Sequence, residues 1–304
     1  MKSTLKNLYN IDANTLIKYS NKVYKVKNDE DEYCLKCIDC STNNQIIDKI
    51  EALNLSQCFI MPLKTCIRSN EINYKNNMFY LSKWVEDDNI NSKDLKIKYY
   101  LSKIATLHKK SSYTLNVTSS FYNEIAYKIE ELIQETFQKY ETIMFNIERI
   151  DYKSPFQWYF TFHFKDIVDC LDESKKQLLE FKNIMKDKSI IRQVITHQNF
   201  AYDHVFLSKD KIISNEKMKL ASPIFDILSL FNNVEFGSID ISGLIDEYSK
   251  INELYDYEKH WLLSYLFIAK DFKVVDDDKV NLKNMMNIIF RLKSVVNLKE
   301  NLTK

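Results

Sequence analysis

The chain has 304 residues, enough for about two lobes around a large buried core. Its 43 lysines and arginines nearly balance its 42 acidic residues, so the net charge of +1 gives no global attraction to nucleic acid or to an anionic membrane. The longest apolar run, residues 261–269, is too short to span a bilayer, and the N-terminus lacks the apolar stretch of a secretory signal. We therefore expect a protein made in the cytoplasm, with neither nucleic acid nor membrane as its partner.

The first part of the chain is predicted to be rich in strands. Residues 22–27 and 33–38 each alternate apolar and polar side chains on either side of a polar turn, which predicts a hairpin. Residues 44–56 carry isoleucines and leucines at helical spacing, and residues 59–67 and 78–85 are predicted as two further strands. We therefore expect a small sheet with one helix in this part.

From residue 94 onward the hydrophobic period changes from two to about 3.6 residues, which predicts helices. Helical patterns cover residues 95–109, 121–150, 164–185, 224–231, 238–254, 257–272 and 282–298. A short strand pair is predicted around Val205 and Ile213. The order of elements predicts an α+β fold with a small β-rich N-terminal lobe, residues 1–85, and a large α-helical C-terminal lobe, residues 86–304.

Residues 195–207 have the frame of a phosphotransferase catalytic loop, in which the pattern His-x-Asp-x-x-x-x-Asn supplies a base and a magnesium ligand. His197 is present, but Asn199 stands at the position of that aspartate and His204 at the position of the asparagine. The neutral amide of Asn199 cannot take a proton near neutral pH, whereas a carboxylate can. The loop thus predicts a kinase fold that has lost its catalytic base.

Lys36 lies late on the second strand of the predicted hairpin, where a lysine facing a cleft would meet nucleotide phosphates. An isolated lysine on an edge strand would be expected to face solvent. Its place in the order of motifs favours the nucleotide site. Glu51, on the following helix, is the first candidate for its ion-pair partner and Asp48 the second, although both also suit a solvated helix face.

Two groups of side chains have the donor types of a metal site. Cys34, Cys37 and Cys40 form a C-x-x-C-x-x-C run, but residues three apart on a strand point to opposite faces and do not converge on one ion. The second group has imidazole and carboxylate donors: His197, Asp203, His204 and Glu216. Because loop histidines more often only form hydrogen bonds, we expect no metal site in either group.

Five short segments occur in a fixed order: Tyr33-Cys-Leu-Lys36, Phe79-Tyr-Leu-Ser-Lys-Trp-Val85, Ile104-Ala-Thr-Leu-His108, His197-Gln-Asn-Phe-Ala-Tyr202 and Phe225-Asp-Ile-Leu228. Together they resemble the spore coat protein CotS family, which is related to aminoglycoside phosphotransferases and choline kinases. The resemblance covers nearly the whole chain. It implies a bilobal, protein-kinase-like fold, a vestigial ATP and magnesium site at Lys36 and Glu51, synthesis in the mother cell, and a place in the spore coat among other coat proteins.

The chain departs from this family at the residues that carry the chemistry. The family's metal-binding run resembles Ile-Asp-Phe-Asp, and Ser214, Asn215 and Glu216 stand in its place. Ser214 offers a hydroxyl where magnesium favours a carboxylate, although Glu216 would keep one contact. The turn at residues 19–24 has no glycine, so its backbone lacks the freedom to approach a phosphate closely. The catalytic loop, the metal-binding run and the turn expected to face the phosphates therefore all depart from the family. We expect no cofactor and no bound metal.

Asp226 resembles the aspartate that, in kinase-like folds, accepts hydrogen bonds from the backbone of the catalytic loop. An acid in the first turn of a helix also has a local explanation in the helix dipole. We interpret Asp226 and His197 as structural residues, because removing one member of a buried polar network leaves the others without partners.

Residues 156–164 place seven aromatic or imidazole rings in nine positions. We expect this segment to pack between helices of the large lobe. An exposed patch of that size would instead mark an interaction surface.

These observations favour a catalytically degenerate kinase-fold protein that serves as a structural or interaction component of a bacterial spore coat. One alternative is an active small-molecule phosphotransferase of the aminoglycoside or choline kinase type, with Asp203 or Glu216 replacing the lost carboxylates. The other is a regulatory pseudokinase that binds a nucleotide without turnover. An enzyme needs a carboxylate and Lys36 within reach of one metal ion, whereas a scaffold needs only packed lobes.

Overall fold

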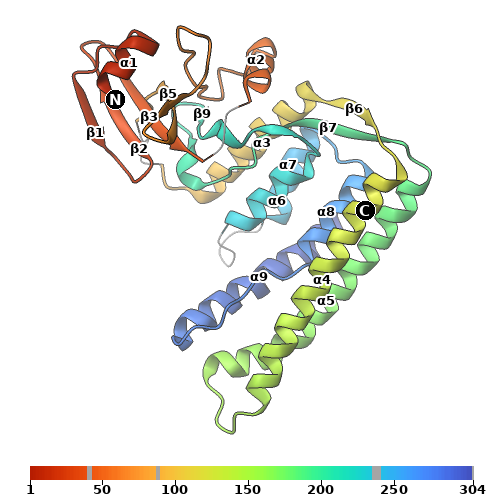
Figure 1. Cartoon of the computed structure of the whole chain (residues 1–304). Helices are drawn as coiled ribbons and strands as arrows, with labels where there is room; N and C mark the ends of the chain where they lie inside the picture. Colours follow the sequence, from red (N-terminus) through yellow and green to blue (C-terminus); the bar gives the residue numbers. More distant parts are fainter. Residues whose placement is uncertain (40–42, 87–89, 235–240, 303–304) are drawn as a thin grey trace. The chain divides into compact units, whose positions relative to one another are not determined.

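The computed structural model describes residues 1–39, 43–86, 90–234 and 241–302 (Figure 1). The chain divides into two units, each built from two stretches of sequence. The first unit contains Met1–Ser111 and Ile195–Ala221, and the second contains Ser112–Val194 and Ser222–Lys304. The predicted lobe boundary at residue 85 is a different division, and it stays a prediction.

Five antiparallel strands form the sheet of the first unit, in the order β1-β2-β3-β5-β4. Their bounds are β1 Thr15–Lys18, β2 Val23–Lys27, β3 Glu32–Ile38, β4 Ile72–Tyr74 and β5 Asn77–Lys83. The predicted hairpin is confirmed, because β2 and β3 pair with Val26 opposite Tyr33. The predicted strand at residues 78–85 is confirmed as β5.

The predicted strand at residues 59–67 is wrong. Within this stretch Phe59 forms an isolated bridge to Ile212, and the strand beside β5 is β4. Pro62 has no N–H to donate to a ladder, and the chain turns where the N–H of Arg68 bonds to the carbonyl of Thr65 at 2.9 Å. Of the apolar residues that suggested a strand, Phe59 is buried by packing, whereas Ile67 is 72% exposed.

One face of the sheet carries the core of the first unit. Val26, Leu35 and Leu81 are completely buried there, together with Leu5 of helix α1 (Lys2–Tyr9). Successive side chains of a strand point to opposite faces. Lys36 and Tyr80, next to Leu35 and Leu81, therefore lie on the other face of the sheet, directly opposite each other in the β3–β5 pair.

The remaining elements of the first unit are α2 Asn44–Ala52, α3 Lys93–Ser111, η1 Tyr202–His204, β8 Val205–Phe206, β9 Lys211–Ile212, η2 Asn215–Lys217 and β10 Lys219–Ala221. They confirm the predicted helices at residues 44–56 and 95–109. The strand pair around Val205 and Ile213 is confirmed as β8 and β9. The side chain of Asn43 caps α2 by accepting hydrogen bonds from the N–H groups of Gln45 and Ile46.

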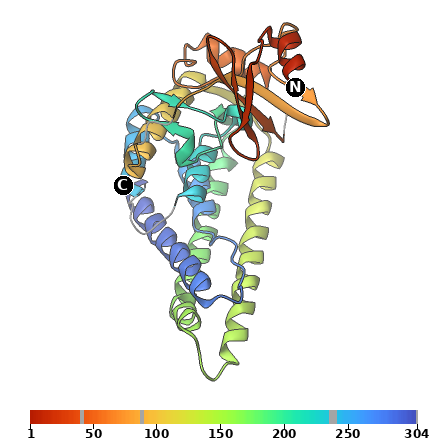
Figure 2. The ribbon, with the colours of Figure 1, turned by 90° about the vertical axis from the view of Figure 1, so that its left-hand side faces the viewer.

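The second unit is mostly helical. Its elements are β6 Tyr113–Asn116, α4 Ser119–Glu148, α5 Pro155–Lys186, β7 Ile190–Thr196, α6 Ile224–Asn233, α7 Ser242–Ile251, α8 Asp256–Leu266 and α9 Asp278–Leu302, with the end of β7 belonging to the first unit. The two longest helices, α4 and α5, run side by side as a hairpin (Figure 2). Every helix predicted in this part is present, although several begin or end elsewhere. Residues 238–240 of one prediction lie outside the described part of the chain.

Helix α5 begins nine residues before its predicted start at residue 164. The Ser154 hydroxyl accepts a hydrogen bond from the N–H of Gln157, and the Gln157 side chain accepts one from the N–H of Ser154. This capping box, with Pro155 in the first turn, fixes the start of the helix. The aromatic segment 156–164 therefore forms the first turns of α5.

The helix predicted to reach residue 272 ends at Leu266. Beyond it, the carbonyl of Ile268 accepts a hydrogen bond from the Arg291 guanidinium at 3.0 Å. The carbonyl of Lys270 accepts one from the Tyr140 hydroxyl at 2.8 Å. Tertiary hydrogen bonds thus satisfy backbone groups that a longer helix would have paired.

The expected packing of the aromatic segment holds for one face of α5 only. Phe156 and Phe160 are buried, whereas Trp158 and Phe162 are 50% and 73% exposed and stack on each other with ring centroids 5.9 Å apart. In the described part of the chain, no helix is long and apolar enough to span a bilayer.

Candidate functional site

Lys36 is the centre of a polar cluster in the first unit. Its ammonium donates hydrogen bonds to Glu216 Oε1 at 2.7 Å and to Ser214 Oγ at 2.8 Å. The side chains of Lys36 and Glu216 are only 14% and 10% exposed. Because water screens such a pair poorly, the contact is stronger than a surface ion pair. The fold thus brings the predicted lysine to the predicted metal-binding segment.

The sheet and the short helix η2 position this cluster together. Tyr80, opposite Lys36 across the β3–β5 pair, donates its hydroxyl to Glu216 Oε2 at 3.3 Å. Ser214 has a φ of 67°, in the left-handed region that costs a non-glycine residue about 1–2 kcal/mol. The next residue, Asn215, anchors this turn by donating to the carbonyl of Ile60 at 2.7 Å. The strained turn presents the Ser214 hydroxyl and the Glu216 carboxylate to the same ammonium.

Asn199 takes part in the cluster as a hydrogen-bond donor. Its side-chain Nδ2 donates to the carbonyl of Ser214 at 2.9 Å and to Glu216 Oε1 at 3.3 Å. An aspartate here would place a second negative charge beside Glu216 and could not donate either bond. The amide at the expected position of the base therefore stabilises the Glu216 carboxylate.

His204 and His197 hold the loop around Asn199. The Nδ1–H of His204 donates to the carbonyl of Asn199 at 2.8 Å. Burial lowers the pKa of His204 below its ordinary value and outweighs its hydrogen bond and the nearby Asp203. His197 is completely buried, and its Nε2–H donates to the carbonyl of Ile213 at 3.2 Å. In the neutral ring Nδ1 then accepts the Tyr100 hydroxyl, also at 3.2 Å. These are the contacts of residues that fix a loop.

The electrostatics of the cluster keep Glu216 ionised. Burial acts to raise its pKa, but the charge of Lys36 and its hydrogen bond outweigh burial, so the Glu216 pKa lies below its ordinary value. The pKa of the Tyr80 hydroxyl is raised, first by burial and then by the neighbouring carboxylate. Tyr80 therefore stays protonated as a donor.

The predicted ion pair between Lys36 and Glu51 is not formed, and neither is the second choice with Asp48. Both carboxylates bond to Lys64, Asp48 at 2.8 Å and Glu51 at 3.2 Å. Residues three apart share one helix face, and here that face of α2 is solvent-exposed. The partner of Lys36 is Glu216, which lies 180 residues further along the chain.

Asp226 lies in the first turn of α6, in the second unit, and is buried. Its expected hydrogen bonds with the catalytic-loop backbone stay a prediction.

The structure describes Cys34 and Cys37, two of the three cysteines in the predicted run. Cys34 precedes Leu35 on β3 and faces away from the core of the first unit, whereas Cys37 packs against that core. Cys40 lies outside the described residues. Within the described ranges, no group of three or more His, Cys, Asp or Glu side chains is placed to hold a metal ion.

The cluster offers magnesium a poor set of ligands. Magnesium favours several charged oxygen ligands in a near-octahedral arrangement. Among the described residues that bond to one another here, Glu216 supplies the carboxylate, and its oxygens already accept bonds from Lys36, Tyr80 and Asn199. Ser214 adds a hydroxyl, which is neutral and donates no charge, and His204 adds an imidazole, which is a poor ligand for this ion.

Comparisons with known proteins identify the fold. No protein-family model matches the sequence, and a comparison with curated proteins finds no match either. Among solved structures, an aminoglycoside phosphotransferase from Alicyclobacillus acidocaldarius has a TM-score of 0.60 at 10% identity, over 96% of this chain and 92% of that one.

Spectinomycin phosphotransferase is similar in two ligand states. Its complex with ADP and spectinomycin has a TM-score of 0.56 at 15% identity, over 98% of this chain and 92% of that one. Its AMP-bound complex has a TM-score of 0.54 at 16% identity, over 100% and 94%. The predicted fold class is confirmed: the chain has the mixed, β-then-α kinase-like fold of these phosphotransferases.

Proposed function

We propose that this chain is a catalytically degenerate kinase-fold protein that works as a structural or interaction component of a bacterial spore coat. It would be made in the mother cell and assemble with other coat proteins. On a kinase-like fold, the altered site residues Asn199, His204 and Ser214 support the loss of chemistry. The coat role is supported by the resemblance of the sequence to the CotS family.

The bond between Lys36 and Glu216 carries the proposal. In an active kinase the lysine contacts nucleotide phosphates while a glutamate of the following helix, here Glu51 or Asp48 by position, holds it. In this chain a nearly buried carboxylate holds the ammonium at 2.7 Å, and the pKa of that carboxylate is lowered. A triphosphate would have to displace Glu216 and then lie beside its negative charge. Leaving the nearly buried Glu216 charge without its partner opposes nucleotide binding.

The loss of the base matters less than the loss of charge neutralisation. General base catalysis contributes roughly a hundredfold to ten-thousandfold, so its loss alone leaves a slow kinase. Phosphoryl transfer depends mainly on positioning and on neutralisation of the phosphates by metal and lysine. Ser214 and His204 replace the expected metal ligands, and Glu216 holds Lys36. We therefore expect no measurable transfer.

A thermal-shift titration with Mg-ATP tests this proposal. We expect the melting temperature to move by less than about 1 °C at millimolar Mg-ATP, in the full-length protein and equally in Lys36→Met. Stabilisation of the parent, lost in Lys36→Met, would contradict the proposal. Such stabilisation together with release of ADP would indicate an active phosphotransferase. Stabilisation without turnover would indicate a regulatory pseudokinase.

A variant that restores the expected ligands tests whether the residues at 199, 204 and 214 cause the loss of Mg-ATP binding. Combining Asn199→Asp, Ser214→Asp and His204→Asn returns the pattern's carboxylates and amide beside Lys36, so Mg-ATP should stabilise this variant more than the parent. Equal responses of two folded proteins would show that these positions are not the cause.

The coat role needs a separate test. An antibody against the chain should detect it in coat extracts of purified spores and in sporulating mother cells. Detection in vegetative cells, with none in the coat fraction, would contradict the coat assignment and leave the loss of chemistry untouched.

A further inference from the structure

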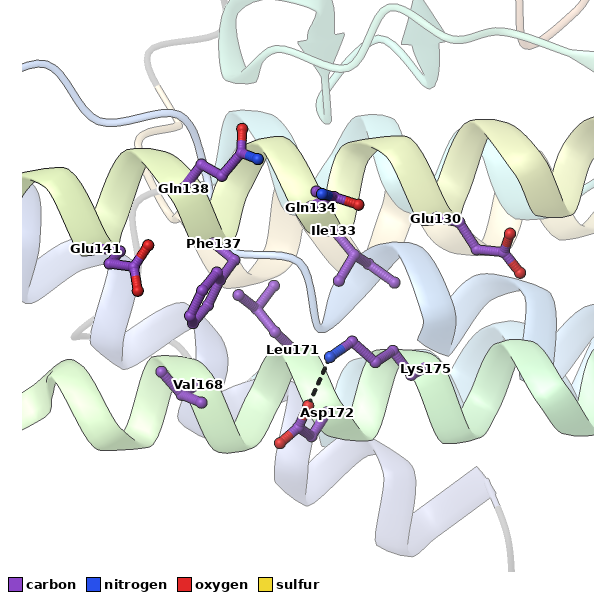
Figure 3. A pocket seen from close by; sticks show the side chains of 10 residues that line it. All are labelled: Glu130, Ile133, Gln134, Phe137, Gln138, Glu141, Val168, Leu171, Asp172 and Lys175. Carbon is purple, nitrogen blue, oxygen red and sulfur yellow. Dashed lines mark hydrogen bonds and ion pairs between the residues drawn. The ribbon is translucent and has the colours of Figure 1, made fainter.

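A groove of about 570 Å³ runs between α4 and α5 in the second unit (Figure 3). Its lining residues recur at intervals of three and four, from Glu130 to Glu141 on α4 and from Val168 to Lys175 on α5. Such spacing follows one face of each helix. At 1.5 Å per residue the α4 side extends for about 16 Å, which is three helical turns.

The floor of the groove is apolar. Ile133 and Leu171 are 3% and 2% exposed, and Phe137 is 36% exposed. All three side chains point into the space between the two helices (Figure 3). A ligand with apolar side chains would bury the remaining surface of Phe137 and gain from its removal from water.

The rim of the groove is acidic. Glu130, Glu141 and Asp172 contribute three carboxylates, against the single ammonium of Lys175, so the lining carries a net charge of −2 while the whole chain carries +1. Lys175 bonds to Asp172 at 2.8 Å within the same rim. Lys182 approaches Glu130 at 3.3 Å, but both side chains are exposed enough for solvent to weaken this pair.

We propose that this groove docks a basic amphipathic helix of a partner protein. Two adjacent helices leave a channel that a third helix can fill, with anchors one turn apart. Leucine-type side chains of the partner would lie on Ile133, Phe137 and Leu171, and its lysines or arginines would reach the carboxylates of the rim. The groove shares no residue with the Lys36 cluster, so this proposal and the loss of chemistry stand or fall separately.

A helical probe peptide tests the proposal. The probe is a fluorescein-labelled peptide of about 14 residues, with leucines on one face and lysines on both flanks. Fluorescence anisotropy with the full-length protein at low salt should show saturable binding. The triple variant Glu130→Gln, Glu141→Gln, Asp172→Asn should weaken binding at least about tenfold, and added salt should weaken binding to the parent.

A matched triple variant controls for total charge. Glu131→Gln, Glu135→Gln and Asp169→Asn remove the same charge from exposed positions on the same two helices, outside the groove. We expect this variant to bind within about twofold of the parent. Equal weakening by both triples would mean attraction to a general acidic surface and would overturn the proposal.

Steric and helix-breaking controls complete the test. Gln134→Trp should block the groove, whereas Leu132→Trp, at an exposed position outside it, should leave binding unchanged. A peptide that differs from the probe only by a proline at its centre should bind at least about tenfold more weakly. The proposal is overturned by equal binding of the two peptides, by an unaffected Gln134→Trp variant, or by no saturable binding up to about 1 mM probe.

Discussion

Lys36 and Glu216 show what a single pair of residues contributes to the candidate site. Removing one partner of a nearly buried ion pair leaves the other charge without compensation. We expect Glu216→Gln to lower the free energy of unfolding of the protein by about 2 kcal/mol, because the amide can still accept one hydrogen bond from the Lys36 ammonium.

Urea unfolding measures this cost. Glu51→Gln is the matched control, since Glu51 forms an exposed contact with Lys64 and its loss should cost less than about 0.5 kcal/mol. Similar values for the two variants would show that the Lys36 pair contributes no more than a surface contact.

His204 gives the site a dependence on pH. Burial lowers its folded pKa below 6.5, so the unfolded chain takes up this proton first as the pH falls. Stability is therefore lost as the pH falls from the unfolded pKa to the folded pKa, and the loss stops below it. His204→Gln keeps a donor for the Asn199 carbonyl but removes the proton, so the melting temperature should change less between about pH 7 and about pH 5.

His260 serves as the comparison for this pH profile. Burial lowers its pKa as well, and it lies in the second unit. His260→Gln should reduce the slope independently, and the double variant should show the sum of both reductions. A pH profile of His204→Gln identical to that of the parent would contradict the role given to burial.

At the scale of elements, a side-chain cap stabilises the start of α5 but not that of α4. The Ser154 hydroxyl accepts a hydrogen bond from the N–H of Gln157 at the start of α5, whereas Thr118 at the start of α4 makes no side-chain cap bond. Ser154→Ala should therefore lower the free energy of unfolding by about 1 kcal/mol, and Thr118→Ala should change it by less than about 0.3 kcal/mol. Chemical denaturation of both variants gives the comparison, and equal costs would contradict the capping argument.

At the scale of the whole molecule, the stability of the second unit depends on a buried ion pair between distant residues. Arg192 on β7 donates its Nε to Glu258 Oε1 of α8 at 3.0 Å, and a second guanidinium nitrogen bonds to the other carboxylate oxygen. The two side chains are 5% and 0% exposed. Arg192→Met should lower the free energy of unfolding by about 3–5 kcal/mol, because it strands the Glu258 charge.

The double variant Arg192→Met, Glu258→Leu should recover much of that loss, since no buried charge is left unpaired. The exposed pair Glu124–Lys128 on α4 is the control, and Glu124→Gln should cost less than about 0.5 kcal/mol. Urea unfolding measures the loss of free energy of unfolding in each variant. A loss in Arg192→Met no larger than that in Glu124→Gln would contradict this account.

Local patterns in the sequence were enough to predict most of the fold. The alternation in β2 and β3 and the helical spacing in α3 and α4 are set by neighbours in the chain, so they are visible without coordinates. The stretch at residues 59–67 had the same apolar character, but only Phe59 forms a bridge there and Ile67 is 72% exposed. Residue pattern alone cannot separate a strand from an apolar coil, because pairing in a ladder depends on partners elsewhere in the chain.

The amino-acid sequence alone determined which residue types stand at the chemical positions: a lysine at 36, an amide at 199, a serine at 214 and a glutamate at 216. Tertiary structure decided how they pair. Glu51 was the predicted partner because it lies on the helix that follows the strand of Lys36, yet Glu216, 180 residues away, holds Lys36. A nearly buried ion pair between different elements forms where folding brings the two charges together, and the sequence separation of the residues does not give that distance.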